Sequence, residues 1–283
     1  MKIIECPRDA MQGIKSFIPT EDKVRYINQL LKVGFDTIDF GSFVSPKAIP
    51  QMKDTSEVVR RLDLSASKSS LLAIVANVRG AGDAAQFDEI RYLGFPLSIS
   101  ETFQKRNTNS TIGEALSMLT EIQEMCTKKS KELVVYISMG FGNPYNDPYD
   151  VDVVSKFVDI LQTLEVKVVS LADTIGVATP TEITSLFGSL VKSFPNLELG
   201  VHLHSNPSSA MDKITSAYRA GCKRFDGAVK GFGGCPMAKD ELVGNLATES
   251  IIDFLTHEGA SPDLNLQEFD RAISTATEIF PNE

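Results

Sequence analysis

The sequence predicts an α/β fold, specifically a (β/α)8 or TIM barrel with one additional C-terminal helix. Eight short β-type runs alternate with longer amphipathic stretches, and parallel strands joined by right-handed helical crossovers close into such a barrel. The length of 283 residues suits one barrel of roughly 250 residues. No G-x-G-x-x-G follows the first run, which disfavours an open dinucleotide-binding sheet. We therefore expect residues 1–283 to form a single barrel domain.

The expected strands are short runs rich in β-branched and aliphatic residues. They are Ile3–Cys6, Thr37–Phe43, Leu71–Ala76, Ile90–Ile99, Leu133–Ser138, Val166–Leu171, Leu197–His204 and Arg224–Val229. Helices are expected where apolar residues recur every three or four positions. Their expected starts are Thr20, Thr111, Asp150, Thr179 and Ser208 or Ser209. A last helix over 264–280 is expected to pack outside the ring.

The composition excludes several classes of protein. Lys and Arg number 28 against 37 Asp and Glu, a net charge of −9, so we expect no nucleic-acid partner and no binding to an acidic membrane surface. The longest apolar runs, 71–75 and 133–137, are too short to cross a bilayer. The first residues show no charged segment followed by an apolar core, so we expect a cytoplasmic protein.

Polar side chains gather where the predicted strands end, which is where barrels place their functional residues. His202 and His204 are two apart on the seventh strand, so both side chains point into the barrel. Asp9 follows the first strand, which neighbours the eighth in a closed ring. Two imidazoles and a carboxylate suit a divalent ion, Mg²⁺ or Mn²⁺ first, with Zn²⁺ or Co²⁺ also able to bind. The alternative, a pair of hydrogen-bonded core histidines, is disfavoured by the H-x-H spacing at a strand end.

Three charged residues near these strand ends are candidates for catalysis, and each has a structural alternative. Arg8 could stabilise a developing enolate or carboxylate oxygen, or it could form only a salt bridge at the rim. Asp39 and Asp173 follow or end predicted strands. Each could take part in catalysis or could simply hold a loop or cap a helix.

The four cysteines form no C-x-x-C pair, so free thiols are expected. Cys235 lies in the glycine-rich segment 231–236. A thiol on such a loop above a metal site is a candidate proton donor. Cys6, Cys126 and Cys222 are expected to be buried structural thiols, the usual state of a free cysteine.

Seven segments, in order along the chain, carry a resemblance to a known family. They are 7–12, 42–52, 106–114, 173–177, 202–204, 231–236 and 244–249. On these segments the chain resembles the 3-hydroxy-3-methylglutaryl-CoA lyases, which are metal-dependent barrel enzymes. The S-F-V-S-P-K and G-x-G-G-C-P segments are specific to the lyase branch. The R-D and H-x-H elements are shared with isopropylmalate and homocitrate synthases and related aldolases.

The resemblance implies a reaction and a set of metal ligands. The reaction is cleavage of 3-hydroxy-3-methylglutaryl-CoA, or a close hydroxyacyl-CoA, to acetyl-CoA and acetoacetate. The implied partner is thus a small acyl-CoA substrate, and the family tends to form homodimers. The implied ligands of the divalent metal ion are Asp9, His202, His204 and Asn245.

The resemblance also implies roles for further residues. Arg8 would stabilise the enolate oxygen of acetyl-CoA, and Cys235 would help to protonate the carbanion. The full implied catalytic set is Arg8, Asp39, Asp173 and Cys235. The implied substrate contacts are Gln12, Asn107 and Thr174.

Four positions depart from the usual pattern of these lyases and bear on which thioester is cleaved. Asp39 stands where Glu is common, and Ser205 stands where Asp or Asn is common. Asn143 replaces a frequent Cys, and Lys230 replaces a small residue. Two other functions stay open: a related aldolase or condensing enzyme acting on a 2-oxo acid, and a non-catalytic metal-binding barrel.

An anionic CoA ester requires positive charge at the mouth of this acidic protein. We expect Arg8 to supply it first, with Lys47, Arg106 and Lys230 as further candidates. These basic residues would form a local patch against the overall negative sign of the chain.

Overall fold

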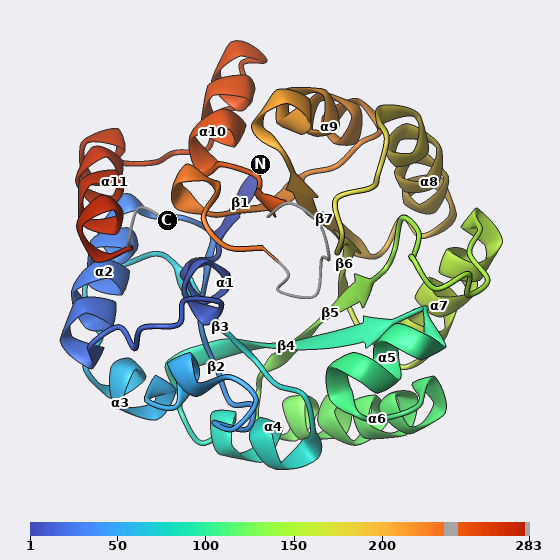
Figure 1. Cartoon of the computed structure of the whole chain (residues 1–283), viewed down its shortest axis with the longest axis horizontal. Coiled ribbons are helices and arrows are strands. Elements are labelled where there is room, and N and C mark those ends of the chain that lie inside the picture. The colour runs from blue at the N-terminus through green and yellow to red at the C-terminus, as the bar shows by residue number, and fades with distance from the viewer. Residues whose placement is uncertain (235–242, 281–283) are drawn as a thin grey trace.

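The computed structural model describes residues 1–234 and 243–280. Its parallel strands form a closed ring, because β1 pairs with both β2 and β8, and β6 pairs with β7 (Figure 1). The ring consists of β1 (Lys2–Glu5), β2 (Thr37–Ser42), β3 (Ser70–Ile74), β4 (Ile90–Ser98), β5 (Glu132–Ser138), β6 (Val168–Asp173), β7 (Glu198–Ser205) and β8 (Arg224–Gly227). A short strand, β9 (Gly244–Asn245), pairs antiparallel with the end of β7. The predicted (β/α)8 barrel is confirmed.

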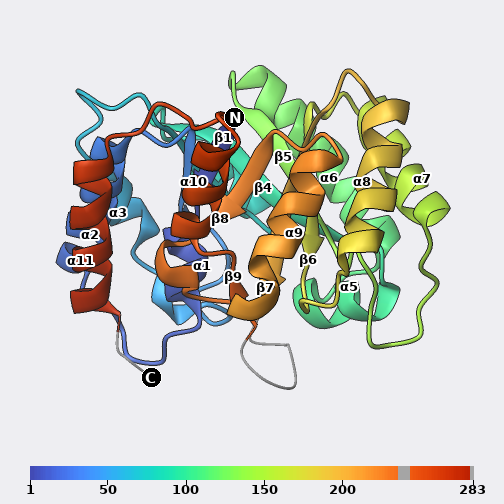
Figure 2. The same ribbon diagram turned by 90° about the horizontal axis from the view of Figure 1, so that it is seen from above.

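Helices surround the ring, and the side view shows the N-terminus at the face opposite β9 (Figures 1 and 2). They are α1 (Pro7–Gln12), α2 (Thr20–Val33), α3 (Thr55–Arg60), α4 (Val78–Ala84), α5 (Glu101–Thr108), α6 (Ile112–Lys128), α7 (Val151–Thr163), α8 (Pro180–Ser193), α9 (Pro207–Arg219), α10 (Thr248–His257) and α11 (Leu266–Ile279), with 3-10 turns η1 (Pro50–Met52) and η2 (Val229–Gly231). None of these described helices is both long and apolar enough to cross a membrane.

Side-chain caps explain where several helices begin. Thr111 and Thr179 each accept a hydrogen bond from the third residue of their helix, and a Glu at that position bonds back to the threonine. This reciprocal capping satisfies backbone donors that have no partner inside the helix. One expected start is wrong: α9 begins at Pro207 rather than at Ser208 or Ser209, because Asn206 provides the cap.

The additional C-terminal helix packs outside the ring against α2, as expected. The ring of Phe269 in α11 meets Phe35 edge to face at 5.9 Å between centroids. Phe280, directly after α11, makes the same kind of contact with Tyr26 of α2 at 5.3 Å. Such edge-to-face pairs add to the stability gained from burying the rings.

The barrel interior is apolar on one side and charged on the other. The apolar side consists of Leu72, Tyr92, Val134, Tyr136 and Val168. The charged side includes Arg224 and Asp226 of β8, both buried. Gly200 of β7 makes room for the arginine, because a Cβ there would lie 2.8 Å from the Arg224 Cδ. A barrel interior is normally filled by branched apolar residues, so the charged side marks an unusual region beneath the strand ends.

Candidate active site and metal centre

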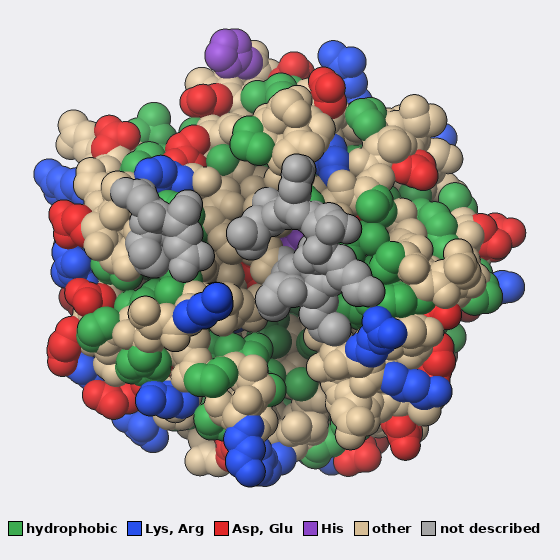
Figure 3. All heavy atoms as spheres, viewed as in Figure 1, with side chains coloured by type: hydrophobic (Ala, Val, Ile, Leu, Met, Phe, Trp, Pro, Cys, Tyr) green, Lys and Arg blue, Asp and Glu red, His purple; other side chains and the backbone are tan. Residues whose placement is uncertain are grey.

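The carboxyl ends of the strands surround a cavity of about 890 Å³. Its lining comes from α1, from the ends of β3 to β7, and from residues of α5 and α6. Viewed down the barrel, the surface is hollowed at the centre of the ring, and a histidine side chain is visible at the bottom (Figure 3). The cavity thus lies where the barrel rule places functional residues.

Helix α1 brings three polar residues to this cavity. It starts one residue after β1 with Pro7, whose restricted backbone suits the first helical position. Asp9 and Gln12 are three apart and therefore share a helix face. Gln12 Nε2 donates to Asp9 Oδ1 at 2.6 Å, and Arg8 Nη1 donates to the same oxygen at 2.8 Å. The Asp9 carboxylate is thereby fixed toward the barrel interior.

The two predicted histidines lie beside Asp9. His204 Nε2 is 3.9 Å from Asp9 Oδ2, and the imidazole centroids of His202 and His204 are 5.1 Å apart. Asp9, His202 and His204 each offer one ligand atom, and these atoms lie within 4.8 Å of one another. His204 Nε2 is buried and has no hydrogen-bond partner among the described residues. A buried nitrogen lone pair without a partner is costly, which is the signature expected of a metal ligand.

The charges of this group suit a cation. Burial alone would raise the pKa of Asp9, but Arg8, the two histidines and the Asn245 amide lower it to about 2. Burial lowers the pKa of His204 to about 4, with the neighbouring His202 acting in the same direction. At neutral pH the aspartate is therefore ionised and His204 is neutral, the forms that bind a metal ion.

Asn245 reaches the group through β9, which pairs with β7 so that Asn245 lies opposite His204. Its Nδ2 donates to Asp9 Oδ2 at 2.7 Å and to the Phe232 carbonyl at 2.8 Å. The amide therefore presents hydrogens, not its oxygen, to Asp9. Its role as a fourth ligand stays a prediction, since it requires the side chain to turn Oδ1 toward the ion.

Arg8 is held on its other side by Asp39, at the middle of β2. Arg8 Nη2 and Nε donate to Asp39 Oδ2 at 2.6 and 3.1 Å. Burial raises the pKa of Asp39 to about 6, and the Arg8 charge opposes that rise, so the carboxylate is ionised at neutral pH. Arg8 lines the cavity, whereas Asp39 is not among the described residues of its lining. The contacts make Asp39 the support of Arg8, and its own catalytic role stays a prediction.

Asp173, at the end of β6, makes contacts typical of a residue that holds a loop in place. Its carboxylate accepts hydrogen bonds from the backbone of Val177 and Ala178 at 2.8 and 3.1 Å. Lys213 of α9 donates to it at 2.7 Å and also bonds the carbonyls of His204 and Gly176. Asp173 is not among the described lining residues of the cavity. A direct catalytic role for it stays a prediction.

Replacing Lys213 with Met is expected to destabilise the protein by about 3 kcal/mol, because it leaves the buried Asp173 charge without a partner. Both side chains are almost fully buried, at 3% and 1% exposure. Urea unfolding followed by circular dichroism measures the change. Lys192→Met, in an exposed position of α8, is the control and should change stability by less than about 0.5 kcal/mol. Equal effects of the two substitutions would contradict the pairing.

The three predicted substrate contacts, Gln12, Asn107 and Thr174, all line the cavity. Arg106 lines it as well, with its guanidinium 4.8 Å above the Tyr145 ring. Lys230 does not belong to the described lining, because its Nζ extends toward Thr277 of α11, at 3.4 Å from Oγ1. The expected positive patch is therefore smaller than the sequence suggested.

The remaining predicted positions lie elsewhere. Cys235 lies outside the described residues, while the other three cysteines are free and buried, as expected. Asn143 bonds the backbone of residues 145 and 147 and so shapes its own loop. Ser205 bonds Ser209 and the Asn206 carbonyl at the start of α9. Neither Asn143 nor Ser205 is among the described residues that line the cavity.

Sequence reasoning missed Asp226, whose Oδ2 lies 3.2 Å from His202 Nδ1. A signal was available, because Arg224 and Asp226 alternate on a strand that must be buried in a barrel. Lys213 was missed as well, and nothing local in a helix sequence distinguishes a buried lysine from an exposed one.

Comparisons with known proteins identify the family of this chain. The HMGL-like family model matches residues 2–275. Hydroxymethylglutaryl-CoA lyase YngG of Bacillus subtilis is 32% identical over 262 residues, covering 93% of this chain and 87% of the relative. The crystal structure of the Bacillus subtilis HMG-CoA lyase superimposes with a TM-score of 0.92 at 31% identity, covering 98% of this chain and 92% of that one.

A further solved structure carries ligands. It is an HMG-CoA lyase from Acinetobacter baumannii in complex with coenzyme A and 3-methylmalate. It matches with a TM-score of 0.90 at 29% identity, covering 99% of this chain and 90% of that one. With a family match along almost the whole chain and relatives above 30% identity, this protein belongs to the hydroxymethylglutaryl-CoA lyase family.

Proposed function

We propose that this protein is a divalent-metal-dependent carbon–carbon lyase. Its substrate is 3-hydroxy-3-methylglutaryl-CoA, or a close hydroxyacyl-CoA, and its products are acetyl-CoA and acetoacetate. One observation carries the proposal: His204 Nε2, buried and without a hydrogen-bond partner in residues 1–234 and 243–280, lies beside Asp9 and His202 at a cavity within the strand ends. Family membership and the coenzyme A bound to the Acinetobacter relative support the choice of substrate.

The donor set fits a divalent ion. Two imidazoles and one carboxylate leave coordination positions open for substrate oxygens, and Mg²⁺ or Mn²⁺ suits such a set. An ion bound there would polarise the substrate and lower the pKa of its tertiary hydroxyl. Asp9, His202 and His204 hold this site, and Gln12 and Asn245 hold Asp9 in place through hydrogen bonds.

Arg8 supplies positive charge where the reaction develops negative charge. Breaking the carbon–carbon bond leaves an electron pair on the acetyl-CoA fragment, which is shared with its thioester oxygen as an enolate. The Arg8 guanidinium is fixed by Asp39 and Asp9 before substrate arrives. A cation that needs no reorganisation stabilises such a charge most effectively.

The α5 side of the cavity suits the thioester and its carrier. Arg106, Asn107 and Ser110 provide a charge and hydrogen-bonding groups on one wall. Arg106 is the basic residue of this wall and can pair with an anionic group of coenzyme A. The homodimer and the cytoplasmic location stay predictions from the sequence.

One assay tests the proposal. The purified protein is freed of metal with a chelator, supplied with Mg²⁺ or Mn²⁺, and offered 3-hydroxy-3-methylglutaryl-CoA while acetoacetate is measured. We expect acetoacetate only when metal is present. Condensation of acetyl-CoA with a 2-oxo acid, without acetoacetate, would instead support the synthase-like alternative. Metal binding with neither reaction would support a non-catalytic barrel.

A further inference from the structure

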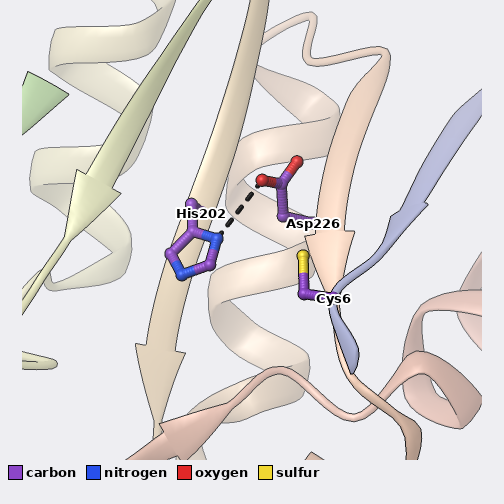
Figure 4. A group of neighbouring side chains, drawn as sticks. All are labelled: Cys6, His202 and Asp226. Carbon is purple, nitrogen blue, oxygen red and sulfur yellow. Dashed lines mark hydrogen bonds and ion pairs between the residues drawn. The ribbon is translucent and has the colours of Figure 1, made fainter. Parts of the chain in front are cut away.

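A buried carboxylate, Asp226, contacts His202 and has no part in the proposed reaction. Strands β7 and β8 pair at Val201 and Phe225, so the residues that follow, His202 and Asp226, both point into the barrel. His202 Nδ1 lies 3.2 Å from Asp226 Oδ2. The second ring nitrogen of His202 points away from Asp226 (Figure 4).

Burying the Asp226 carboxylate at this position is energetically unfavourable. Its side chain is fully buried, and burying a carboxylate costs several kcal/mol unless it is paired. Arg224, two residues earlier on the same inward face of β8, provides opposite charge. Asp226 Oδ1 nevertheless has no hydrogen-bond partner among the described residues. Within the part of the chain that the structure describes, the Asp226 side chain forms one hydrogen bond, to His202.

The contact between the two groups determines where the imidazole hydrogen lies. Asp226 Oδ2 accepts a hydrogen bond from Nδ1, so in the neutral His202 ring Nδ1 carries the hydrogen and Nε2 keeps its lone pair. His204 reaches the same state differently, since its Nδ1 donates to the Thr174 carbonyl at 3.0 Å. Both rings therefore keep Nε2 free as a ligand atom.

We propose that Asp226 is a positioning residue that fixes the tautomer and the ring orientation of His202, so that Nε2 is ready to bind the divalent ion. The inference rests on the proposed metal site formed by Asp9, His202 and His204. Histidine ligands are commonly held in this way by a carboxylate or carbonyl, and losing such a partner weakens metal binding by about 10- to 100-fold.

A competing interpretation involves Cys6, which lies next to the pair (Figure 4). Cys6, His202 and Asp226 each offer a ligand atom, and these atoms lie within 4.8 Å of one another. They could form an ion site of their own. We favour the positioning role because Nδ1 and Oδ2 are at hydrogen-bond distance, and because the Cys6 thiol is directed to the Ile4 carbonyl at 3.7 Å.

The first test measures the tautomer in the metal-free protein. Protein with ¹⁵N-labelled histidine is compared by NMR with Asp226→Asn and Asp226→Ala, and His202→Ala assigns the signals. We expect the Nδ1–H form of His202 in the parent protein. Asp226→Asn can donate to Nδ1 through its amide, so the hydrogen should move to Nε2, and Asp226→Ala should show a mixture of tautomers. An unchanged Nδ1–H signature in both variants would overturn the inference.

The second test measures Mn²⁺ affinity by competition with a chelator of known affinity. Asp226→Asn is expected to bind about 10- to 100-fold more weakly than the parent protein, whereas Cys6→Ala, next to it in the fold, should bind equally well. A loss in Cys6→Ala as large as that in Asp226→Asn would overturn the positioning role in favour of the three-residue ion site. Unchanged Mn²⁺ affinity in His202→Ala would show that the proposed metal site is wrong, while the tautomer test still decides whether Asp226 holds the ring.

Discussion

Replacing His204 with Ala is expected to abolish Mn²⁺ binding and to reduce acetoacetate production by roughly 10³-fold or more, since a bound metal contributes several kcal/mol to catalysis. The physical reason is the position of His204 Nε2, which is buried beside Asp9 and has no hydrogen-bond partner in the described part of the chain. Removing the ring leaves one imidazole and one carboxylate, too few ligands to hold an ion against water. Metal content after gel filtration and the rate of acetoacetate formation measure the two effects.

His257→Ala is the matched control for this experiment. His257 ends α10, is exposed, and contacts the Asp253 carbonyl of its own helix. Its removal should leave metal content and rate within about twofold of the parent, as for other surface substitutions. Full metal content together with full activity in His204→Ala would show that the ion binds elsewhere. Full metal content with lost activity would restrict His204 to a role in the reaction itself.

Replacing Arg8 with Met is expected to lower kcat by about 10²- to 10³-fold, the usual cost of removing a group that stabilises transition-state charge. Metal content should fall much less, because Gln12 and Asn245 still hold Asp9. The combination of retained metal and lost turnover separates this role from that of His204. Arg91→Met, in an exposed pair with Glu132 at the start of β4, should retain full activity. Loss of metal together with activity would mean that Arg8 acts mainly by holding Asp9.

The Arg8–Asp39 pair also predicts a pH dependence. Burial raises the pKa of Asp39 to about 6, so the carboxylate is ionised above pH 6 and becomes protonated below it. Once protonated, it no longer holds the guanidinium, and kcat should fall as the pH drops through about 6. The Asp39→Asn variant should have a lower kcat at all pH values, and its kcat should no longer fall as the pH drops through about 6. If kcat of Asp39→Asn still falls there as steeply as in the parent protein, another group is responsible for the pH dependence.

The barrel and the three candidate metal ligands were predictable because the signals are local or follow from the barrel's closure. Strand and helix periods depend on neighbours only a few positions away, so eight strands were found within one or two residues of their ends. His202 and His204 share a face because strand side chains alternate with a period of two. Asp9 could be added because a closed barrel places its first strand beside the eighth.

The contacts that tune the site depend instead on residues that meet only after folding. Arg8 in α1 contacts Asp39 in β2, and the β2–β3 register shifts just after Asp39. Asp173 at the end of β6 pairs with Lys213 of α9, the helix that follows β7. The sequence pattern cannot show whether an aspartate pairs with a cation near the reaction or only holds a loop, because the same residue type serves both roles. The distances and the burial of the partners distinguish them.

The chain's own pattern of residues was therefore sufficient for the architecture, the cavity's location and the three candidate metal ligands Asp9, His202 and His204. Folding decided how each of them is held: by Arg8 and Gln12 for Asp9, by Asp226 for His202, and by the Thr174 carbonyl for His204. The physical reason is the distance along the chain over which each kind of interaction acts. Periodicity acts along the chain over a few residues, whereas a hydrogen bond requires atoms within about 3 Å, and strand register and burial set that separation.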